Sequence, residues 1–174
     1  MKKYNLVVYP DGVLRKKAKE VLKIDDEVKN LVEQMLDIMY ANNGIGLAAP
    51  QVGVLLQVVV IDLQEDDKKN PMVVINPKIL NKSKELSELK EGCLSLPEIR
   101  GLVLRPAEIT VEFLDLEGKK HLLHADDLLA TCFQHEIDHL NGRLFIDYLP
   151  VQEKNSLLRV YKKQQEESKT NEQN

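Results

Sequence analysis

Cysteine is scarce in this 174-residue sequence, which contains only Cys93 and Cys132. Two thiols cannot build the disulfide framework of a small secreted domain, so this composition favours a reducing compartment. Histidine is also rare, and all four histidines lie between residues 121 and 139. Few side chains are therefore available for metal binding or nucleophilic chemistry, and their positions carry most of the functional information.

Long hydrophobic runs are missing as well. The longest apolar stretch covers residues 52–61 and is interrupted by Gln57, whereas a membrane-spanning helix needs about 20 apolar residues. The apolar run at residues 6–9 stops at the turn-forming sequence Pro10-Asp11-Gly12, which leaves no hydrophobic region for a signal peptide. We therefore expect a cytoplasmic protein with no membrane association.

An excess of positive charge is absent too. Twenty-four Lys and Arg residues face twenty-eight Asp and Glu residues, for a net charge of −4, which excludes a chain-wide basic face for DNA or RNA. Residues 151–165 are the local exception, because their basic residues outnumber Glu153; these are Lys154, Arg159, Lys162 and Lys163. The simpler interpretation is a solvated helix face, and the alternative is an electrostatic contact with ribosomal RNA.

The hydrophobic pattern predicts one catalytic domain over residues 1–165, followed by a polar, frayed tail at 166–174. Amphipathic spacing predicts a helix that starts at Asp25 or Asp26, a second from Asp126 to Gly142, and a third that starts at Pro150.

Segments rich in β-branched residues predict strands between the first two helices, at residues 55–63, 72–80, 102–104, 109–116 and 119–125. Pro77 places the second of these near a sheet edge. The grouping of strands predicts an α+β fold, with short antiparallel strands around a central helix and further helices near the two termini.

The strongest chemical signal is His135-Glu136-Ile137-Asp138-His139, inside the second predicted helix. Side chains four residues apart lie one turn apart on one helix face, so the two imidazoles can meet at a metal ion while Glu136 serves as a general base. The alternative is a polar, exposed helix segment with no metal. Apolar neighbours favour burial and therefore a metal; these are Leu129, Cys132, Phe133, Ile137 and Leu140.

Two histidines leave a third ligand to be found. Thermolysin-like enzymes have a Glu about twenty residues downstream, where this chain has Arg159, and the longer metzincin pattern fails because residue 145 is Phe. The third ligand is therefore a carboxylate or cysteine from elsewhere. Cys132 lies about 10.5 Å from His139 along the helix axis, which favours packing behind the site. Cys93 follows Gly92 in a segment that can present a thiolate, and we favour it as the ligand.

Three segments together resemble the signature motifs of the peptide deformylase family. They are Gly44-Ile45-Gly46-Leu47-Ala48-Ala49-Pro50-Gln51, then Glu91-Gly92-Cys93-Leu94-Ser95, then Gln134-His135-Glu136-Ile137-Asp138-His139. Alone, the first segment indicates only a turn whose backbone another group approaches closely. The similarity extends over residues 1 to about 165, and the short gap between the first two motifs and the helical C-terminus resemble the compact bacterial, iron-dependent subclass.

The resemblance implies that Cys93, His135 and His139 bind one divalent ion, usually Fe²⁺, with Zn²⁺, Ni²⁺ or Co²⁺ as possible replacements. Ligand chemistry alone would favour zinc. The implied reaction is removal of the formyl group from N-formylmethionyl nascent peptides, with release of formate. Glu136 then acts as base and acid, while the Gln51 side chain and the Leu94 N–H hold the oxyanion.

The resemblance also implies a substrate site in which the peptide adds as an extended strand. Its main chain would lie near Ile45, Gly46 and Gly92, with Arg100 beside it. The methionine pocket would be lined by Ile45, Leu128, Cys132 and the ring of His135. Two alternatives remain: a metallopeptidase that cleaves unformylated peptides, and a non-catalytic metal-binding module in which Glu136 is dispensable. The absence of a third ligand downstream of His139 argues against the peptidase.

Overall fold

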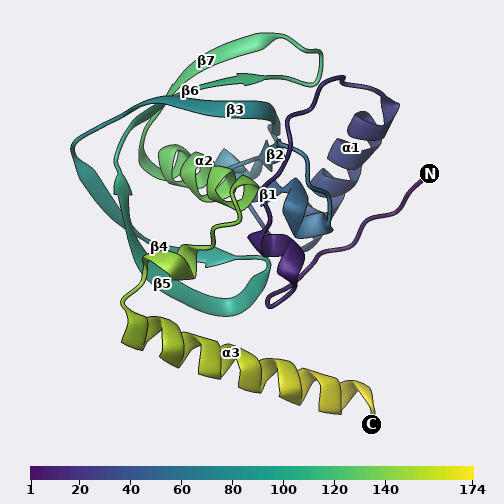
Figure 1. Cartoon of the computed structure of the whole chain (residues 1–174), viewed down its shortest axis with the longest axis vertical. Coiled ribbons are helices and arrows are strands. Elements are labelled where there is room, and N and C mark those ends of the chain that lie inside the picture. Colours follow the sequence, from purple (N-terminus) through teal and green to yellow (C-terminus); the bar gives the residue numbers. More distant parts are fainter.

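A computed structural model describes residues 1–174, and its helices and strands are grouped as expected for an α+β protein. Helix α1 spans Asp26–Ala41, α2 spans Asp127–Leu140 and α3 spans Val151–Glu172. Helix α2 lies in the centre of the molecule with strands on both sides of it (Figure 1). The predicted fold class, with its central helix and its N- and C-terminal helices, is confirmed.

Five strands form one antiparallel sheet in the order β1-β2-β3-β6-β7. Their bounds are Gly46–Ala48 for β1, Val58–Ile61 for β2, Met72–Lys82 for β3, Ile109–Leu114 for β6 and Lys120–Ala125 for β7. Strand β1 pairs only with β2, so it forms one edge of the sheet. It was expected to be a turn from its glycines and small residues.

Strand β3 corrects part of the prediction for Pro77. In the strand order it lies between β2 and β6 and not at the edge, but it pairs with β2 only over residues 72–75, so the segment from Pro77 onward has only β6 beside it. The pairing with β6 shifts register between Ile75 and Lys78, and Asn76 has a positive φ of 52°. A β-bulge leaves a residue out of the hydrogen-bond ladder, so it accommodates a proline, which has no N–H to donate.

A second, two-stranded sheet consists of β4 (Leu86–Cys93) and β5 (Leu96–Pro106). It lies on the other side of α2 from β3, β6 and β7 (Figure 1). The sequence pattern predicts only residues 102–104 of this hairpin, and β4 was not predicted. Only one face of this sheet is buried, so alternate residues of β4 are exposed. Because several of its residues are Glu or Lys, the segment lacks the run of β-branched and aromatic residues from which a strand is predicted.

The core surrounds α2 and the inner face of α1. Asp25 caps α1 by accepting a 3.0 Å hydrogen bond from the Val28 N–H. Met35 and Met39 of this helix are fully buried. At the end of α2, Gly142 has a φ of +72°, and a Cβ there would lie 2.4 Å from the carbonyl oxygen of Arg15, so only glycine fits this turn.

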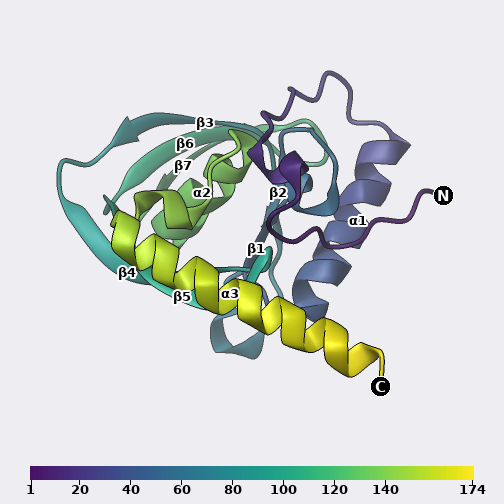
Figure 2. The same cartoon turned by 60° about the horizontal axis from the view of Figure 1, so that its bottom comes forward.

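Helix α3 packs across the β4–β5 sheet (Figure 2). Its buried Tyr161 hydroxyl donates a 2.7 Å hydrogen bond to the carbonyl oxygen of Tyr9. The helix continues to Glu172, so most of the tail expected to fray from residue 166 is helical. No glycine or proline follows Pro150 to stop it.

The domain boundary at residue 165 stays a prediction. None of the helices is long and apolar enough to cross a membrane.

Candidate active site

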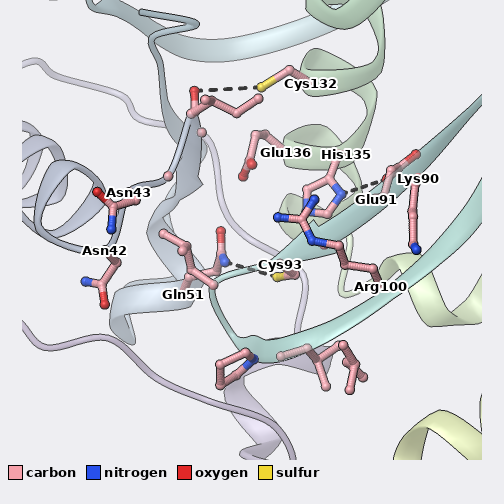
Figure 3. A pocket seen from close by; sticks show the side chains of 18 of the residues that line it. Asn42, Asn43, Gln51, Lys90, Glu91, Cys93, Arg100, Cys132, His135 and Glu136 are labelled. Carbon is pink, nitrogen blue, oxygen red and sulfur yellow. Dashed lines mark hydrogen bonds and ion pairs between the residues drawn. The ribbon is translucent and has the colours of Figure 1, made fainter.

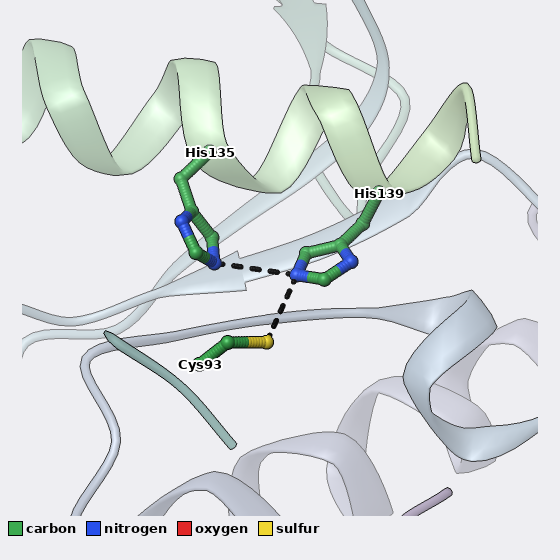
Figure 4. A group of neighbouring side chains, drawn as sticks. All are labelled: Cys93, His135 and His139. Atoms are coloured by element: carbon green, nitrogen blue, oxygen red, sulfur yellow. Dashed lines mark hydrogen bonds between the residues drawn. The ribbon is translucent and has the colours of Figure 1, made fainter. Parts of the chain in front are cut away.

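His135 and His139 project from the same face of α2, one turn apart (Figure 4). Their Nε2 atoms lie 3.2 Å from each other. Both residues are buried, at 8% and 1% exposure. The spacing of the sequence motif therefore produces the convergence that it predicted.

Cys93 ends β4 and comes from the opposite side of the site. The chain turns through Leu94 and Ser95 into β5, and this turn places Cys93 Sγ 3.3 Å from His139 Nε2 (Figure 4). One ligand atom from each of Cys93, His135 and His139 lies within 4.8 Å of the others. Cys132 is not part of this group.

The donor set fits a divalent transition metal. One thiol sulfur and two imidazole nitrogens are ligands for Zn²⁺ and Fe²⁺ alike. Burial lowers the pKa of His139, which favours the neutral ring that metals bind. The three residues thus form a group that could hold a metal ion.

Glu91 anchors the ring of His135. Its Oε1 lies 2.8 Å from His135 Nδ1, and both groups are buried. A carboxylate at Nδ1 fixes the orientation of a metal-binding imidazole and makes its other nitrogen a stronger ligand. Glu91 belongs to the second sequence motif, but the sequence alone does not predict this role.

Arg105 neutralises the buried Glu91 carboxylate. Its Nε and Nη2 donate to the two oxygens of Glu91 at 2.7 and 3.0 Å, and its Nη1 donates to Asp138 Oδ2 at 2.8 Å. Burial alone would raise the pKa of Glu91, but the hydrogen bonds from His135 and Arg105 outweigh it and lower this pKa. The role of Arg105 was not predicted from the sequence either. Its inward position on β5 becomes evident only once β4 is paired with β5.

Glu136 is buried beside the metal-binding group, with 4% exposure. Its Oε2 has no hydrogen-bond partner, and burial raises the pKa of this carboxyl to about 7. Gly46 provides the space that the carboxyl occupies, because a Cβ at Gly46 would lie 2.6 Å from Glu136 Oε1. This close approach explains why the second glycine of the first sequence motif, Gly46, has no side chain.

Gln51 points its amide nitrogen toward the thiol of Cys93 (Figure 3). It lies in a short 3₁₀ helix, Ala49–Val52, where its Oε1 accepts from the Ala48 N–H at 2.9 Å. Its Nε2 donates to Ser95 Oγ at 3.1 Å and to Cys93 Sγ at 3.4 Å. These contacts fix which end of the amide faces the thiol.

A cavity of about 730 Å³ opens beside these groups. The site residues proposed from the sequence all line it except His139, which is buried behind them; the lining ones are Ile45, Gly46, Gln51, Gly92, Cys93, Leu94, Arg100, Leu128, Cys132, His135 and Glu136. The structure therefore brings together residues from β1, β4, β5 and α2. Cys132 lies on the helix side of the cavity, where its Sγ is 3.9 Å from the carbonyl oxygen of Ile45 (Figure 3).

The other two histidines lie outside this site. His121 Nε2 lies 2.7 Å from Asp115 Oδ2, and its ring stacks on Phe113. His124 is 4.0 Å from Glu108. Both residues are on β7 at the far edge of the sheet from β1, so they take no part in the metal-binding group.

Known proteins of one family are similar to this chain in sequence and in fold. The profile of the family described as Polypeptide deformylase matches residues 3–155. A peptide deformylase from Bartonella henselae is 49% identical over 168 residues, which cover 96% of each chain. The crystal structure of a peptide deformylase from Legionella pneumophila is similar with a TM-score of 0.90, at 41% identity, over 95% of this chain and 96% of that one. A peptide deformylase from Ehrlichia chaffeensis, solved in complex with actinonin, is similar with a TM-score of 0.88, at 40% identity, over 94% and 98% of the two chains.

Proposed function

The chain belongs to the polypeptide deformylase family, and from this membership we propose how its residues carry out the reaction. The enzyme is a metal-dependent hydrolase that removes the N-formyl group from nascent N-formylmethionyl peptides. The endopeptidase alternative is not favoured by these relatives.

We propose that Cys93 Sγ and the Nε2 atoms of His135 and His139 hold one divalent ion. We assign Fe²⁺ as the resident ion, with Zn²⁺, Ni²⁺ or Co²⁺ as replacements. The proximity of these three donors supports the ligand set. When bound, such an ion acidifies water and polarises a carbonyl oxygen.

Glu136 is the proposed proton carrier. It takes a proton from the water that attacks the formyl carbon, and it returns this proton to the amine nitrogen that leaves. The unpaired, buried Oε2 of Glu136 supports this role, because no neighbouring donor competes for it.

Gln51 and Leu94 are the proposed oxyanion donors. Negative charge develops on the formyl oxygen as water attacks, and fixed N–H groups stabilise it. The Gln51 amide already points its Nε2 toward Cys93, and Leu94 follows Cys93 in the turn between β4 and β5. The Gln51 amide is held in place by its contacts with Ala48 and Ser95.

The peptide is proposed to add as a strand at the free edge of β1. Ile45 and Gly46 would pair with its main chain on one side and Gly92 on the other, with Arg100 beside it. The methionine side chain would enter the space bordered by Ile45, Leu128, Cys132 and His135. That all of these residues line one cavity supports the assignment.

We further propose that the enzyme acts in the cytoplasm and that the basic segment at residues 151–165 of α3 contacts ribosomal RNA. The net charge of this segment supports it, with four basic residues against one acidic one. The test is co-sedimentation with ribosomes at low and high salt. Absent or salt-insensitive binding would contradict the contact.

One observation carries the functional assignment: Cys93, His135 and His139 converge beside a cavity that Glu136 lines. The test is an anaerobic preparation in which metal content and formate release from formyl-Met-Ala-Ser are measured together. We expect about one ion per chain and formate release, with no cleavage of the unformylated peptide. A Glu136→Gln variant should keep the metal and lose formate release. A metal-replete protein that releases no formate would overturn the assignment.

A further inference from the structure

Two basic residues, Lys90 and Arg100, lie at the rim of the cavity where β4 meets β5 (Figure 3). Arg100 is opposite Gly92 in the strand register, and Lys90 is two residues from Gly92 along β4. Both side chains are exposed and belong to the outward face of this two-stranded sheet. Neither forms an ion pair with a residue of the chain.

The acidic residues that line the cavity balance only one of these two positive charges. Glu91 is buried and neutralised by Arg105, while Glu136 lies inside the cavity, away from the rim. Glu98 is the remaining acidic residue that lines the cavity, and it is exposed. The rim beside β4 therefore carries a local excess of positive charge on a chain whose net charge is −4.

The direction of β4 places Lys90 along the path of the substrate. This strand runs toward the metal-binding group and ends at Cys93. A peptide with its formyl group at Cys93 and its main chain beside Gly92 runs in the opposite direction, away from the metal. Lys90 is three residues from Cys93, or about 10 Å at the rise of an extended strand. An extended peptide covers that length with the residues that follow its methionine.

We infer that Lys90, with Arg100, is a specificity-determining residue that favours nascent chains with an acidic side chain among the three residues after methionine. This inference rests on the proposed function, because it assumes the placement of the formyl group at Cys93. The physical cause is a direct charge contact at the exposed rim. The long, flexible lysine side chain reaches more than one position of the peptide, so the preference extends over neighbouring residues.

The size of the preference follows from exposure. An ion pair at a solvent-exposed position changes affinity about two- to five-fold. Replacing an attractive aspartate in the peptide by a repelled lysine combines two such effects, so we expect a ratio of about four- to 25-fold in kcat/KM. The difference should be in KM, since the charges lie away from the reacting atoms.

The test uses formylmethionyl peptides with amidated C-termini and Asp, Ala or Lys placed in turn at the second, third or fourth position. The wild-type enzyme should favour Asp over Lys in at least one of these positions, and this preference should vanish near 1 M salt, where the Debye length is about 3 Å. The Lys90→Glu variant should invert the preference, and Lys90→Gln should give an intermediate ratio. Lys84→Glu is the matched control, because Lys84 is exposed between β3 and β4, outside the cavity, and its substitution changes the net charge equally.

Each outcome has a distinct meaning. An unchanged Asp-to-Lys ratio in Lys90→Glu overturns the inference, and so does an equal shift in Lys84→Glu, which would reflect the total charge of the protein. Deformylation of the neutral Ala peptide by the wild-type enzyme tests the proposed function separately. Loss of the charge preference alone therefore leaves the deformylase assignment intact.

Discussion

Glu91 Oε1 lies 2.8 Å from His135 Nδ1, while Nε2 of the same ring lies 3.2 Å from Nε2 of His139. The two nitrogens of His135 thus have separate tasks, one toward an anchoring carboxylate and one toward the proposed metal. Arg105 in turn holds both oxygens of Glu91. The position of the ring therefore depends on β4 and β5 as well as on its own helix.

The Glu91→Gln variant should bind the metal more weakly. Loss of the carboxylate removes the charge that orients and polarises the His135 ring, and such changes cost about 10- to 100-fold in metal affinity. Competition with a chelator, followed by metal analysis, measures this loss. Glu88→Gln is the matched control, because Glu88 lies on the same strand with its side chain exposed. Equal metal affinity in the two variants would contradict the anchoring role.

The Gly46→Ala variant should lose most of its turnover. A Cβ at this position would lie 2.6 Å from Glu136 Oε1 and 3.0 Å from Cys132 Sγ, so the carboxyl has to move. A displacement of about 1 Å at a catalytic group can cost about 10²-fold in rate. Formate release measures it, and Gly12→Ala, whose Cβ would have no neighbour within 4 Å, should keep wild-type activity. Wild-type turnover in Gly46→Ala would show that the Glu136 position is not critical.

The Gln51→Leu variant should lower kcat by about 10²–10³-fold, the usual effect of removing one oxyanion donor. Metal content should stay unchanged, because Gln51 is not among the proposed ligands. Ser95→Ala should cause a smaller loss, since it removes one of the contacts that hold the Gln51 amide. Steady-state kinetics with metal analysis distinguishes these effects. A Gln51→Leu enzyme that changed only KM would contradict an oxyanion role.

Asp62 should make the fold sensitive to acid. Burial alone would raise the pKa of Asp62, but hydrogen bonds from the Tyr40 hydroxyl and from the N–H groups of Gln64 and Asn70 outweigh it and lower this pKa. A lowered pKa in the folded state stabilises the protein above the unfolded value of about 3.9, and this contribution disappears as the pH falls through the folded-state pKa.

The Asp62→Asn variant measures that contribution. At pH 7 it should be less stable than the wild type by about 1–3 kcal/mol, because buried donors lose a charged acceptor. In strong acid the two unfolding free energies should converge. Urea unfolding across this pH range provides the test, with Asp66→Asn as a control in the exposed part of the same loop. A difference that did not depend on pH would contradict the role of the carboxylate charge.

The sequence predicted the helices and the convergence of His135 with His139 because both depend on local periodicity. It missed β4 because exposed Glu and Lys residues alternate with the inward ones on this strand. It placed β3 near an edge because of Pro77, whereas the strand pairing shows that β3 lies between β2 and β6 and that Pro77 lies at a register shift beyond the last pair with β2. The roles of Glu91 and Arg105 could not be predicted from the sequence either. Each is defined by a partner distant in sequence, and no local pattern encodes that contact.

Strand β1 is only three residues long and has one free edge. If substrates add to that edge, as we propose, they must arrive as extended chain, because a folded N-terminus already uses its main-chain hydrogen bonds. Deformylation then competes kinetically with the folding of each new protein. Proteins whose first residues join a sheet or helix early have the shortest time in which their formyl group can be removed. If the peptide binds to β1 in this way, deformylation has to take place before the N-terminus of the new protein folds.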